Sequence, residues 1–525
     1  MKRTIPYSFF LLIAIILNRV IISSRQISPM ESLRPLLVML LVFSAAFLTI
    51  QFFVREWHRT NFLLALIPIS VLIYEAIYRW IKAAFVENSD VLGLLLIPCI
   101  IFLYAALASP KLWKRIPEPA RITLYLNLVF VILLGMQLAQ LWVEFPYIMK
   151  PDAKTTTTAI APLGEEINLN AEIRPDIYVI VLDGYGRQDV LKEIYNYDNS
   201  GFIGQLEKRG FYVASDSHSN YIQTAYSIAS LMNFDYIQPW DSSTEYSEYL
   251  LDPIRNNRVF QMLSKIGYTT VSFEGGMSYT QIQNSDILDS GFLPLNKFET
   301  LLLTDTPAEP LTNVFNLGIP IPNYQTHRQR ILNHLNEIQS VPNSIAGPKI
   351  TYFHILVPHP PFVFDENGNS IEPNRPYSIL DGDEYPGTQQ EYWTGYRKQV
   401  VFVNGEILTA IDSILAKSAQ PPIILLMGDH GPGSMFRWDP KDPGCMWERT
   451  HNFYALLLPN PPADVTLYPS MTPINSFRVI FNTYFGTDLP LLEDRTYLAT
   501  WQHPGSIIDA TSYRDSTASC SFQGQ

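Results

Sequence analysis

The sequence predicts an α/β protein in which an N-terminal five-helix transmembrane bundle precedes a mostly parallel sheet flanked by helices. Three observations lead to this prediction. Five long apolar segments lie in the first 144 residues, β-rich runs alternate with helical patterns after residue 173, and most Asp and Glu residues follow the apolar part. We therefore expect a transmembrane domain at 1–144, a linker at 145–173 and an extracytoplasmic domain at 174–525.

Each apolar segment approaches the length of a membrane-spanning helix. A hydrocarbon core of ~30 Å needs about 20 helical residues to cross it. The alternative, buried helices of a soluble domain, would make the first 145 residues too apolar for a globular fold. Arg19 lies near the end of the first segment, where it can snorkel to the interface or face a polar cavity between helices. The five segments are 5–22, 36–54, 62–80, 91–108 and 122–143.

The basic residues around these segments predict their orientation. One set of ends carries more of them: Lys2, Arg3, Arg55, Arg59, Lys111, Lys114, Arg115 and Arg121. The opposite loops carry Arg25, Arg34, Arg79 and Lys82, offset by Glu87 and Asp90. The N-terminus is then cytoplasmic, and five crossings of a plasma or inner membrane place the last domain in the periplasm or outside the cell. The first segment could instead be a cleaved signal peptide, but no small-x-small cleavage site follows it.

Charge and cysteine content restrict the class of protein further. The net charge of −12 argues against a nucleic-acid partner, which needs a broad basic face. The threonine-rich stretch 145–173 has no periodicity, as expected of a linker. Cys99 lies in the fourth apolar segment, while Cys445 and Cys520 lie in the outer domain. These two cysteines form a disulfide in an oxidising compartment or remain free thiols.

The outer domain alternates strand and helix patterns. Continuous apolar strands separated by helices indicate a mostly parallel sheet that is covered on both faces. Ligands of such sheets bind beyond the carboxyl ends of the strands. We expect strands at 176–182, 211–215, 268–273, 349–357, 422–427 and 453–459, and helices at 257–267, 327–339 and 396–418.

Two strand ends carry the first candidate site residues. Asp183 follows one predicted strand in "VIVLDGYG", and Asp429 and His430 follow another in "LLMGDHGPG". Two carboxylates and an imidazole at one sheet edge suit a divalent metal such as Zn²⁺ or Mn²⁺. Asp-Gly after a strand is also an ordinary turn, so the prediction depends on the pair of stretches and on the histidine.

Thr224 stands where a helix begins in "SNYIQTAYSIASLMN". The structural alternative is an N-cap threonine that satisfies helix N–H groups. The functional alternative is a nucleophile, because a nearby metal lowers the pKa of the hydroxyl and the helix N-terminus stabilises negative charge.

Histidines supply the remaining candidates. His354 lies near the end of a strand in "FHILVPHPPF", and His359 lies in the turn that follows, where both could bind an anionic substrate or a second metal. Each could instead be a packed histidine. His451, just before a strand, and His218, close before Thr224, are weaker candidates.

In this order, the motifs resemble those of the alkaline phosphatase and sulfatase superfamily: strand-Asp-Gly, Thr at a helix start, His-x4-His-Pro and Gly-Asp-His-Gly. The preceding helices make the chain similar to the membrane-anchored branch that includes lipoteichoic acid synthase and the lipid A phosphoethanolamine transferases. The resemblance covers roughly residues 174–485. It implies an alkaline-phosphatase-like sheet domain.

The resemblance also implies roles for the candidates. Asp183, Asp429 and His430 would be metal ligands, and Thr224 would be both ligand and nucleophile. His354 and His359 would contact the phosphate or a second metal. Two departures matter: no Cys/Ser-x-Pro-x-Arg segment is present, which argues against sulfate-ester hydrolysis, and the first ligand is aspartate where the lipid-transfer branch generally has glutamate.

The expected function is a membrane-bound, metal-dependent phosphoryl-group transferase or hydrolase. It would act on envelope lipid or glycan phosphodiesters through a phospho-threonine intermediate at Thr224, with one or two Zn²⁺ or Mn²⁺ ions. Its partners would be a membrane lipid and a phospholipid or glycan substrate. The alternatives are a phosphodiesterase or nucleotide pyrophosphatase, another hydrolase of the sulfatase family, and an inactive membrane sensor with the same fold. The sequence leaves the donor, the acceptor and the oligomeric state open.

Overall fold

The structure is a computed structural model of the chain. It describes residues 6–23, 29–85, 88–149, 160, 169, 173–239, 246–289, 295–315, 317, 319, 321–375, 377–500 and 505–522. The chain forms two units, and the first comprises residues 1–154, 293–323 and 374–376. The second comprises 155–292, 324–373 and 377–525.

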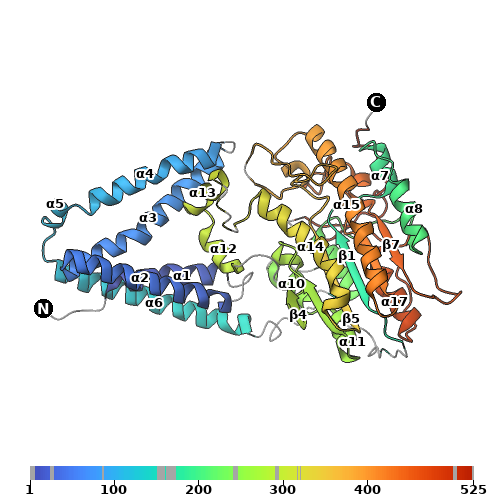
Figure 1. The fold of residues 1–525 in the computed structure, drawn as a ribbon, viewed down its shortest axis with the longest axis horizontal. Helices are drawn as coiled ribbons and strands as arrows, with labels where there is room; N and C mark the ends of the chain where they lie inside the picture. Colours follow the sequence, from blue (N-terminus) through green and yellow to red (C-terminus); the bar gives the residue numbers. More distant parts are fainter. Residues whose placement is uncertain are drawn as a thin grey trace. The chain divides into compact units, whose positions relative to one another are not determined.

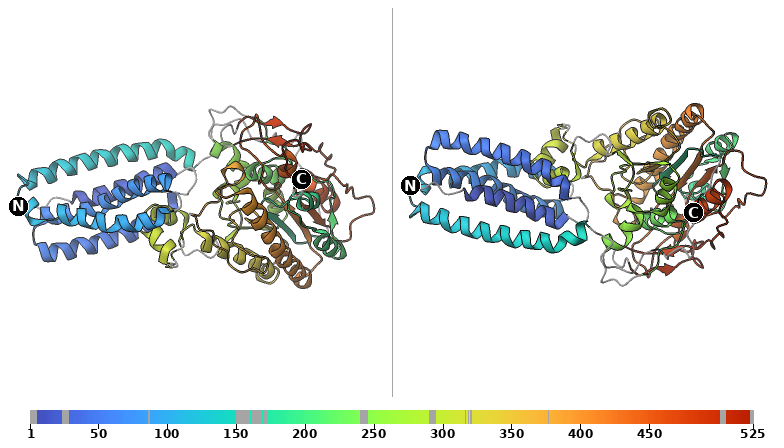
Figure 2. Two further views of the ribbon diagram at one scale, coloured as in Figure 1. Left: turned by 90° about the horizontal axis from the view of Figure 1, so that it is seen from above. Right: turned by 90° about the horizontal axis from the view of Figure 1, so that it is seen from below.

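The first unit is a helical bundle. All five predicted segments are helices: α1 (Tyr7–Ser23), α2 (Leu33–Val54), α3 (Trp57–Ala84), α4 (Ser89–Leu107) and α6 (Pro119–Met149). Short helices precede α2 (η1, Pro29–Ser32) and α6 (α5, Pro110–Trp113). These helices run alongside one another, in blue and cyan (Figure 2). By length and composition, α2, α3, α4 and α6 could cross a membrane, whereas α1 is apolar but has 17 residues.

The inside of the bundle is partly polar. Arg19 of α1 forms an ion pair with Glu75 of α3, which also pairs with Arg79. Glu75 is buried, so Arg19 faces a polar contact between helices rather than the interface. An intramembrane charge is costly unless it is paired, which explains why these residues occur together. Bulky apolar side chains cover the outward faces of the helices, as a lipid-facing surface requires: Phe52, Phe53, Phe102 and Trp142.

Two further helices belong to the first unit although they come from the middle of the outer sequence. They are α12 (Lys297–Leu303) and α13 (Ala308–Phe315), drawn in yellow-green beside the blue helices (Figure 1). Phe298 is buried in one cluster with side chains of α1, α2 and α3. Polar contacts add to this packing: Arg34 with Glu299, Arg79 and Lys82 with Asp305, and Lys82 with Glu309.

The second unit contains a seven-stranded sheet of order β2-β7-β6-β1-β5-β3-β4. The central strands β6, β1, β5, β3 and β4 run parallel, and β7 runs antiparallel to both β6 and β2. The strands are β1 (Ile177–Leu182), β2 (Tyr212–Val213), β3 (Thr269–Phe273), β4 (Ile287–Asp289), β5 (Lys349–Ile355), β6 (Ile423–Gly428) and β7 (Tyr454–Leu457). The six predicted strands and the mostly parallel sheet are confirmed, whereas the sequence did not reveal the short β4.

Side chains of β1 alternate between two cores. Ile177, Val179 and Val181 pack into the first core, and Tyr178 and Ile180 pack into the second. A strand that is buried on both faces must be apolar throughout, as "IYVIVL" is. The first core includes side chains of α9 (Thr224–Asn233), α10 (Tyr246–Arg255), α11 (Arg258–Lys265) and α17 (Ser476–Tyr484). The second includes side chains of α7 (Gln188–Glu193), α8 (Ser200–Lys208), α14 (Tyr324–Ser344) and α15 (Gln389–Lys417).

Helix α15 also has the length and composition of a membrane span. It lies beside α14 in the second unit, and one side of it is buried in the second core (Figure 1). The three helices predicted for the outer domain correspond to α11, α14 and α15.

Short elements complete the second unit. They are η3 (Ser278–Thr280), η4 (Gly382–Glu384), α16 (Met446–Thr450), η5 (Pro473–Asn475) and a two-stranded sheet of β8 (Tyr497–Leu498) and β9 (Ile508–Asp509). Cys445 and Cys520 form a disulfide, which decides between the two alternatives left by the sequence. The predicted linker 145–173 begins within α6, and most of it lies outside the described residues.

Candidate metal and nucleophile site

Adjacent parallel strands bring the two aspartates together. Leu182, the last residue of β1, is in register with Gly428, the last residue of β6. Asp183 and Asp429 therefore leave the sheet side by side at its carboxyl edge. The backbone N–H of Gly184 donates to Asp429 Oδ1 at 3.0 Å, and Gly184 adopts the left-handed φ of +71° that glycine accommodates.

His430 completes a group of possible metal ligands. One atom each of Asp183, Asp429 and His430 lies within 4.8 Å of the others. The Nδ1 of His430 lies 2.8 Å from the carbonyl oxygen of Gly431, to which it donates a hydrogen bond when it carries the proton. That bond leaves Nε2 unprotonated, with Asp429 Oδ2 at 3.4 Å and Asp183 Oδ1 at 3.7 Å.

Thr224 points its hydroxyl at the same place. Its Oγ1 lies 3.1 Å from His430 Nε2, and the residue is 6% exposed. The N-cap of α9 is Gln223, so Thr224 is the first residue of the helix and not its cap. The hydroxyl thus belongs to the polar group at the sheet edge, and the N-cap alternative does not describe it.

The buried carboxylates test whether a metal ion fits. Asp183 and Asp429 are fully buried. Among the described residues no hydrogen bond reaches Asp183 Oδ1 or Asp429 Oδ2, while Asp183 Oδ2 has an ion-pair contact with His354 Nε2 at 3.1 Å. Burial alone would raise the pKa of Asp183, but His359, His354 and His430 outweigh it and hold the pKa below its ordinary value. Buried carboxylate oxygens without partners are costly unless a cation compensates them. The residues present therefore fit a divalent metal with mixed oxygen and nitrogen ligands.

His354 and His359 adjoin this group in different ways. His354 Nε2 lies 3.1 Å from Asp183 Oδ2, and its Nδ1 lies 3.1 Å from Thr280 Oγ1. Burial lowers the pKa of His354, but Asp183 and Asp429 raise it by more, so the pKa lies above its ordinary value. The backbone N–H of His359 donates to the carbonyl oxygen of Asp183, and its Nε2 lies 3.9 Å from Asp381 Oδ2.

A buried ion pair beside the site was not anticipated from the sequence. Arg449 donates to Asp381 Oδ2 at 2.6 Å, and its Nη2 lies 3.2 Å from His430 Nε2. Burial alone would raise the pKa of Asp381, but Arg449 and His359 hold it below its ordinary value. Gln223 was also missed: it is buried, and neither end of its amide has a hydrogen-bond partner in the described part of the chain. A charged residue just before an apolar strand was the available signal for Arg449, and Asp381 lies in a loop without a motif.

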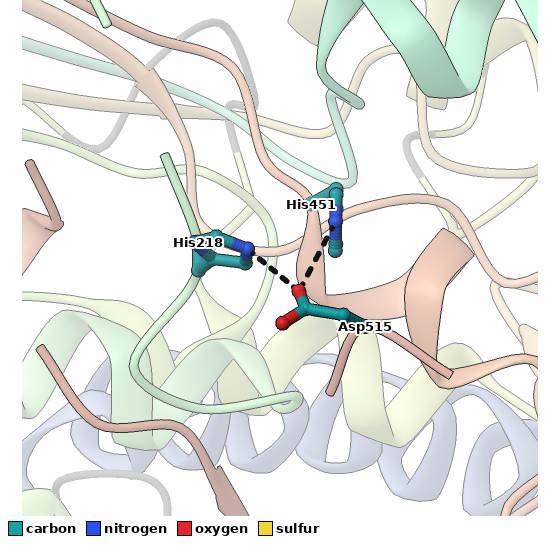
Figure 3. Close-up of side chains that lie close together, drawn as sticks. All are labelled: His218, His451 and Asp515. Atoms are coloured by element: carbon teal, nitrogen blue, oxygen red, sulfur yellow. Dashed lines mark hydrogen bonds and ion pairs between the residues drawn. The ribbon is translucent and has the colours of Figure 1, made fainter. Parts of the chain in front are cut away.

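His218 and His451 do not belong to this group. The structure places them beside each other and beside Asp515, with ring centroids 4.5 Å apart (Figure 3). Both residues were the weaker candidates for the first site. Their described ion-pair contacts are with Asp515 and not with Asp183 or Asp429.

No family model matches the chain, and no curated protein matches it. Solved structures do match. The C-terminal periplasmic domain of EcEptC from Escherichia coli, in complex with Zn, has 14% identity and a TM-score of 0.42, with 67% of this chain and 98% of that one covered.

Two other matches are more distant. A protein in the alkaline phosphatase superfamily from Vibrio parahaemolyticus has 10% identity and a TM-score of 0.38, with coverages of 67% and 78%. The soluble domain of lipooligosaccharide phosphoethanolamine transferase A from Neisseria meningitidis has 13% identity and a TM-score of 0.33, with coverages of 55% and 79%.

Proposed function

We propose that the second unit transfers or hydrolyses a phosphoryl-linked group, with Thr224 as the nucleophile. One observation carries the proposal: the hydroxyl of Thr224 lies 3.1 Å from His430 Nε2, at the sheet edge where Asp183 Oδ1 and Asp429 Oδ2 are buried without a hydrogen bond from any described residue. A hydroxyl has no nucleophilic strength at its free pKa and needs activation. Asp183, Asp429, His430 and Thr224 would hold a divalent ion, which lowers the pKa of the hydroxyl and neutralises charge on the phosphoryl oxygens.

The reaction has two steps. Thr224 Oγ1 forms a bond to phosphorus while the bond from phosphorus to the leaving alcohol breaks. The hydroxyl proton of Thr224 passes to solvent, and the leaving alkoxide takes up one proton from solvent. In the second step the oxygen of an acceptor alcohol, or of water, forms a bond to phosphorus while the bond from phosphorus to Thr224 Oγ1 breaks. The acceptor releases its proton to solvent, and Thr224 Oγ1 takes one up.

The neighbouring side chains have roles in binding and orientation. Asp381 holds the guanidinium of Arg449 toward His430 Nε2, so that Arg449 can bind a phosphoryl oxygen beside the nucleophile. His359 is 6% exposed, and its Nδ1 donates to the carbonyl oxygen of Pro360, so its Nε2 can accept a hydrogen bond from a hydroxyl of the substrate. His354 approaches Asp183 Oδ2 and fixes the orientation of that carboxylate.

The substrate class that we propose is an envelope lipid or glycan phosphodiester, and the domain would face away from the cytoplasm. The apolar helices support this choice, because an enzyme that is anchored in a bilayer meets lipid headgroups at high effective concentration. The basic residues of the connecting loops support the orientation. Zn²⁺ and Mn²⁺ both suit the two carboxylates and one imidazole.

The test uses the full chain in lipid nanodiscs with ³²P-labelled phospholipids and Zn²⁺ or Mn²⁺. Thr224→Ala should lower turnover by about 10³-fold or more and abolish acid-stable labelling of the protein. The matched control is Ser230→Ala, which removes a buried hydroxyl of the same helix; in the described part of the chain this hydroxyl donates to the carbonyl oxygen of Ser227. Full turnover by Thr224→Ala would refute the nucleophile.

Product analysis separates the remaining candidates. Transfer gives a new phosphodiester when an acceptor alcohol is added, whereas a phosphodiesterase gives the same hydrolysis product with and without the alcohol. A wild-type protein that binds metal but neither turns over nor becomes labelled would be the inactive sensor.

A further inference from the structure

The second unit contains another cluster of possible metal ligands, formed by His218, His451 and Asp515 (Figure 3). His218 Nε2 lies 2.9 Å from Asp515 Oδ1, and His451 Nε2 lies 3.4 Å from the same oxygen. In a tetrahedral site with bonds of about 2.0–2.1 Å, ligand atoms lie roughly 3.3 Å apart. The two distances to Asp515 Oδ1 lie on either side of this value, and all three ligand atoms lie within 4.8 Å of one another.

Both imidazoles are held in place by the backbone and by side chains around them. The residues on either side of His218 are fixed, since Arg187 donates to the carbonyl oxygen of Ser217 at 3.0 Å and the N–H of Ser219 donates to the carbonyl oxygen of Thr450 at 2.7 Å. His451 follows directly on α16. Both rings are 2% exposed, so they lose little freedom on binding an ion.

Asp515 is fixed in the same manner although its side chain is 62% exposed. Thr450 Oγ1 lies 3.1 Å from the carbonyl oxygen of Arg514, and the N–H of Trp447 donates to the carbonyl oxygen of Ser516 at 3.3 Å. The Cys445–Cys520 disulfide ties this tail to the residue that precedes α16. The tail thus presents a carboxylate to two imidazoles of the domain.

The hydrogen bonds of the His451 ring leave two acceptors facing each other, whereas His218 Nε2 lies 2.9 Å from Asp515 Oδ1 and can donate to it until an ion replaces its proton. Thr450 Oγ1 lies near two carbonyl oxygens, those of Met446 and Arg514, and its single hydrogen bonds to one of them. It can then accept a hydrogen bond from His451 Nδ1, which lies 3.1 Å away. In this arrangement the lone pair of His451 Nε2 faces a carboxylate oxygen, and the contact is repulsive unless a proton or a metal ion lies between them.

The charged groups around the cluster are paired. Arg514 Nε lies 3.5 Å from Asp515 Oδ2, while both imidazoles face the other oxygen, Oδ1. Arg187 does not present unbalanced charge to an ion, because Asp189 and Asp216 lie 2.7 and 2.8 Å from it.

We propose that His218, His451 and Asp515 bind a second divalent transition-metal ion, Zn²⁺, with an open fourth position toward solvent. The site is separate from the one that contains Asp183, and it does not depend on the proposed chemistry. It links the segment before Thr224 to the C-terminal tail. Two imidazoles and one carboxylate are a common ligand set of such a Zn²⁺ site.

The test counts metal ions on the full chain in detergent micelles after equilibrium dialysis against Zn²⁺, by mass spectrometry of the metal. Wild type should bind two ions, and Asp515→Asn should bind one. Asp515 is exposed, so this variant keeps the fold. The matched control Asp509→Asn, at an exposed aspartate of the same tail, should bind two.

A second readout is the thermal melt. Zn²⁺ should raise the melting temperature of the Asp429→Asn variant, in which the first site is impaired. The melting temperature of the double variant Asp429→Asn/Asp515→Asn should not respond to Zn²⁺. If Asp515→Asn binds as many ions as Asp509→Asn, the second site does not exist. If Asp429→Asn binds as many ions as wild type while Asp515→Asn loses one, the first site fails and the second stands.

Discussion

Buried charges at single residues decide how well the candidate site is ordered. Arg449 is 2% exposed, and it contacts Asp381, His430 and the carbonyl oxygen of Ile222. Its guanidinium also lies over the rings of Phe436 and Trp438, at 5.1 and 5.6 Å from their centroids. Because these contacts surround the planar guanidinium, it is held in one orientation. A fixed orientation favours the binding of a phosphoryl group.

Removing one partner of this ion pair should destabilise the protein more than removing both. Arg449→Met leaves the carboxylate of Asp381 buried and unpaired, and we expect a loss of about 3–5 kcal/mol in the free energy of unfolding. Adding Asp381→Asn to Arg449→Met should restore part of the lost stability. Chemical denaturation of the single and the double variant measures the two free energies of unfolding. Arg495→Met, in an exposed pair with Glu493, is the control and should leave the free energy of unfolding nearly unchanged. Equal effects of Arg449→Met and Arg495→Met would contradict the argument.

Glu337 predicts a dependence of stability on pH. Burial and the neighbouring Asp289 raise the pKa of Glu337 from 4.5 to about 7. The folded state then binds a proton that the unfolded state releases between about pH 4.5 and 7, so the contribution of this carboxyl to stability is lost as the pH rises through that window.

Glu337→Gln removes this loss. We expect the melting temperature of the variant to exceed that of wild type more at pH 8 than at pH 5. Glu207→Gln, on the exposed side of α8, should follow the pH profile of wild type. An unchanged profile in Glu337→Gln would show that this carboxyl has no part in it.

The residues at strand ends were predictable and the loop residues were not. Asp183, Asp429 and His430 each follow an apolar strand, and parallel strands carry their carboxyl ends to one edge, so their proximity follows from the topology. Arg449, Asp381 and Asp515 lie in short segments whose paths depend on tertiary contacts, and no periodicity marks them. Their part in either site could only be seen in the folded chain.

At the scale of elements, long periodic segments were predicted well and short ones were missed. The six predicted strands and three outer helices are present, because a buried strand and an amphipathic helix each have a recognisable pattern. The strands β4, β8 and β9 have only two or three residues, which is too short for a pattern. Helices α12 and α13 are likewise short and were not predicted.

The disulfide should contribute strongly to the stability of the C-terminal elements. Cys445 and Cys520 are separated by 75 residues, and closing a loop of that length stabilises a protein by about 4 kcal/mol in the chain-entropy model. Cys520→Ser should lower the denaturation midpoint of the second unit, and a reductant should lower the midpoint of the wild-type protein to a similar value. Cys99→Ser, at the free exposed cysteine, is the control. A midpoint that is insensitive to both changes would exclude a stabilising disulfide.

For the whole molecule, the two units do not follow the order of the chain. The domain boundaries at 144 and 174 remain predictions, and the unit built on the apolar helices also includes residues 293–323 and 374–376. The sequence did not indicate this, because "FETLLL" in α12 reads as any short amphipathic helix. Which surface receives its apolar face is decided by tertiary packing, here by Phe298 with side chains of α1, α2 and α3.

This exchange predicts how a truncated protein behaves. In a fragment of residues 174–525, Phe298, Leu301 and Leu302 lose the apolar cluster on which they pack in the full chain. We expect the fragment to aggregate or to retain detergent, because each such side chain favours burial by about 1.5–3 kcal/mol. Replacing the three residues by serine should give a monomer of unchanged circular dichroism, measured by size-exclusion chromatography with light scattering.

The matched control is the same fragment with Leu380→Ser and Ile508→Ser, which are exposed in the full chain and contact no cluster there. These changes should leave the aggregation as it is. A detergent-free monomer of the unmodified fragment would contradict the prediction, since α12 would then need no partner from the helical bundle. The expected result instead means that α12 folds as a part of the first unit, although the segments before and after it in the sequence belong to the second. This explains why the chain connects the two units at more than one place.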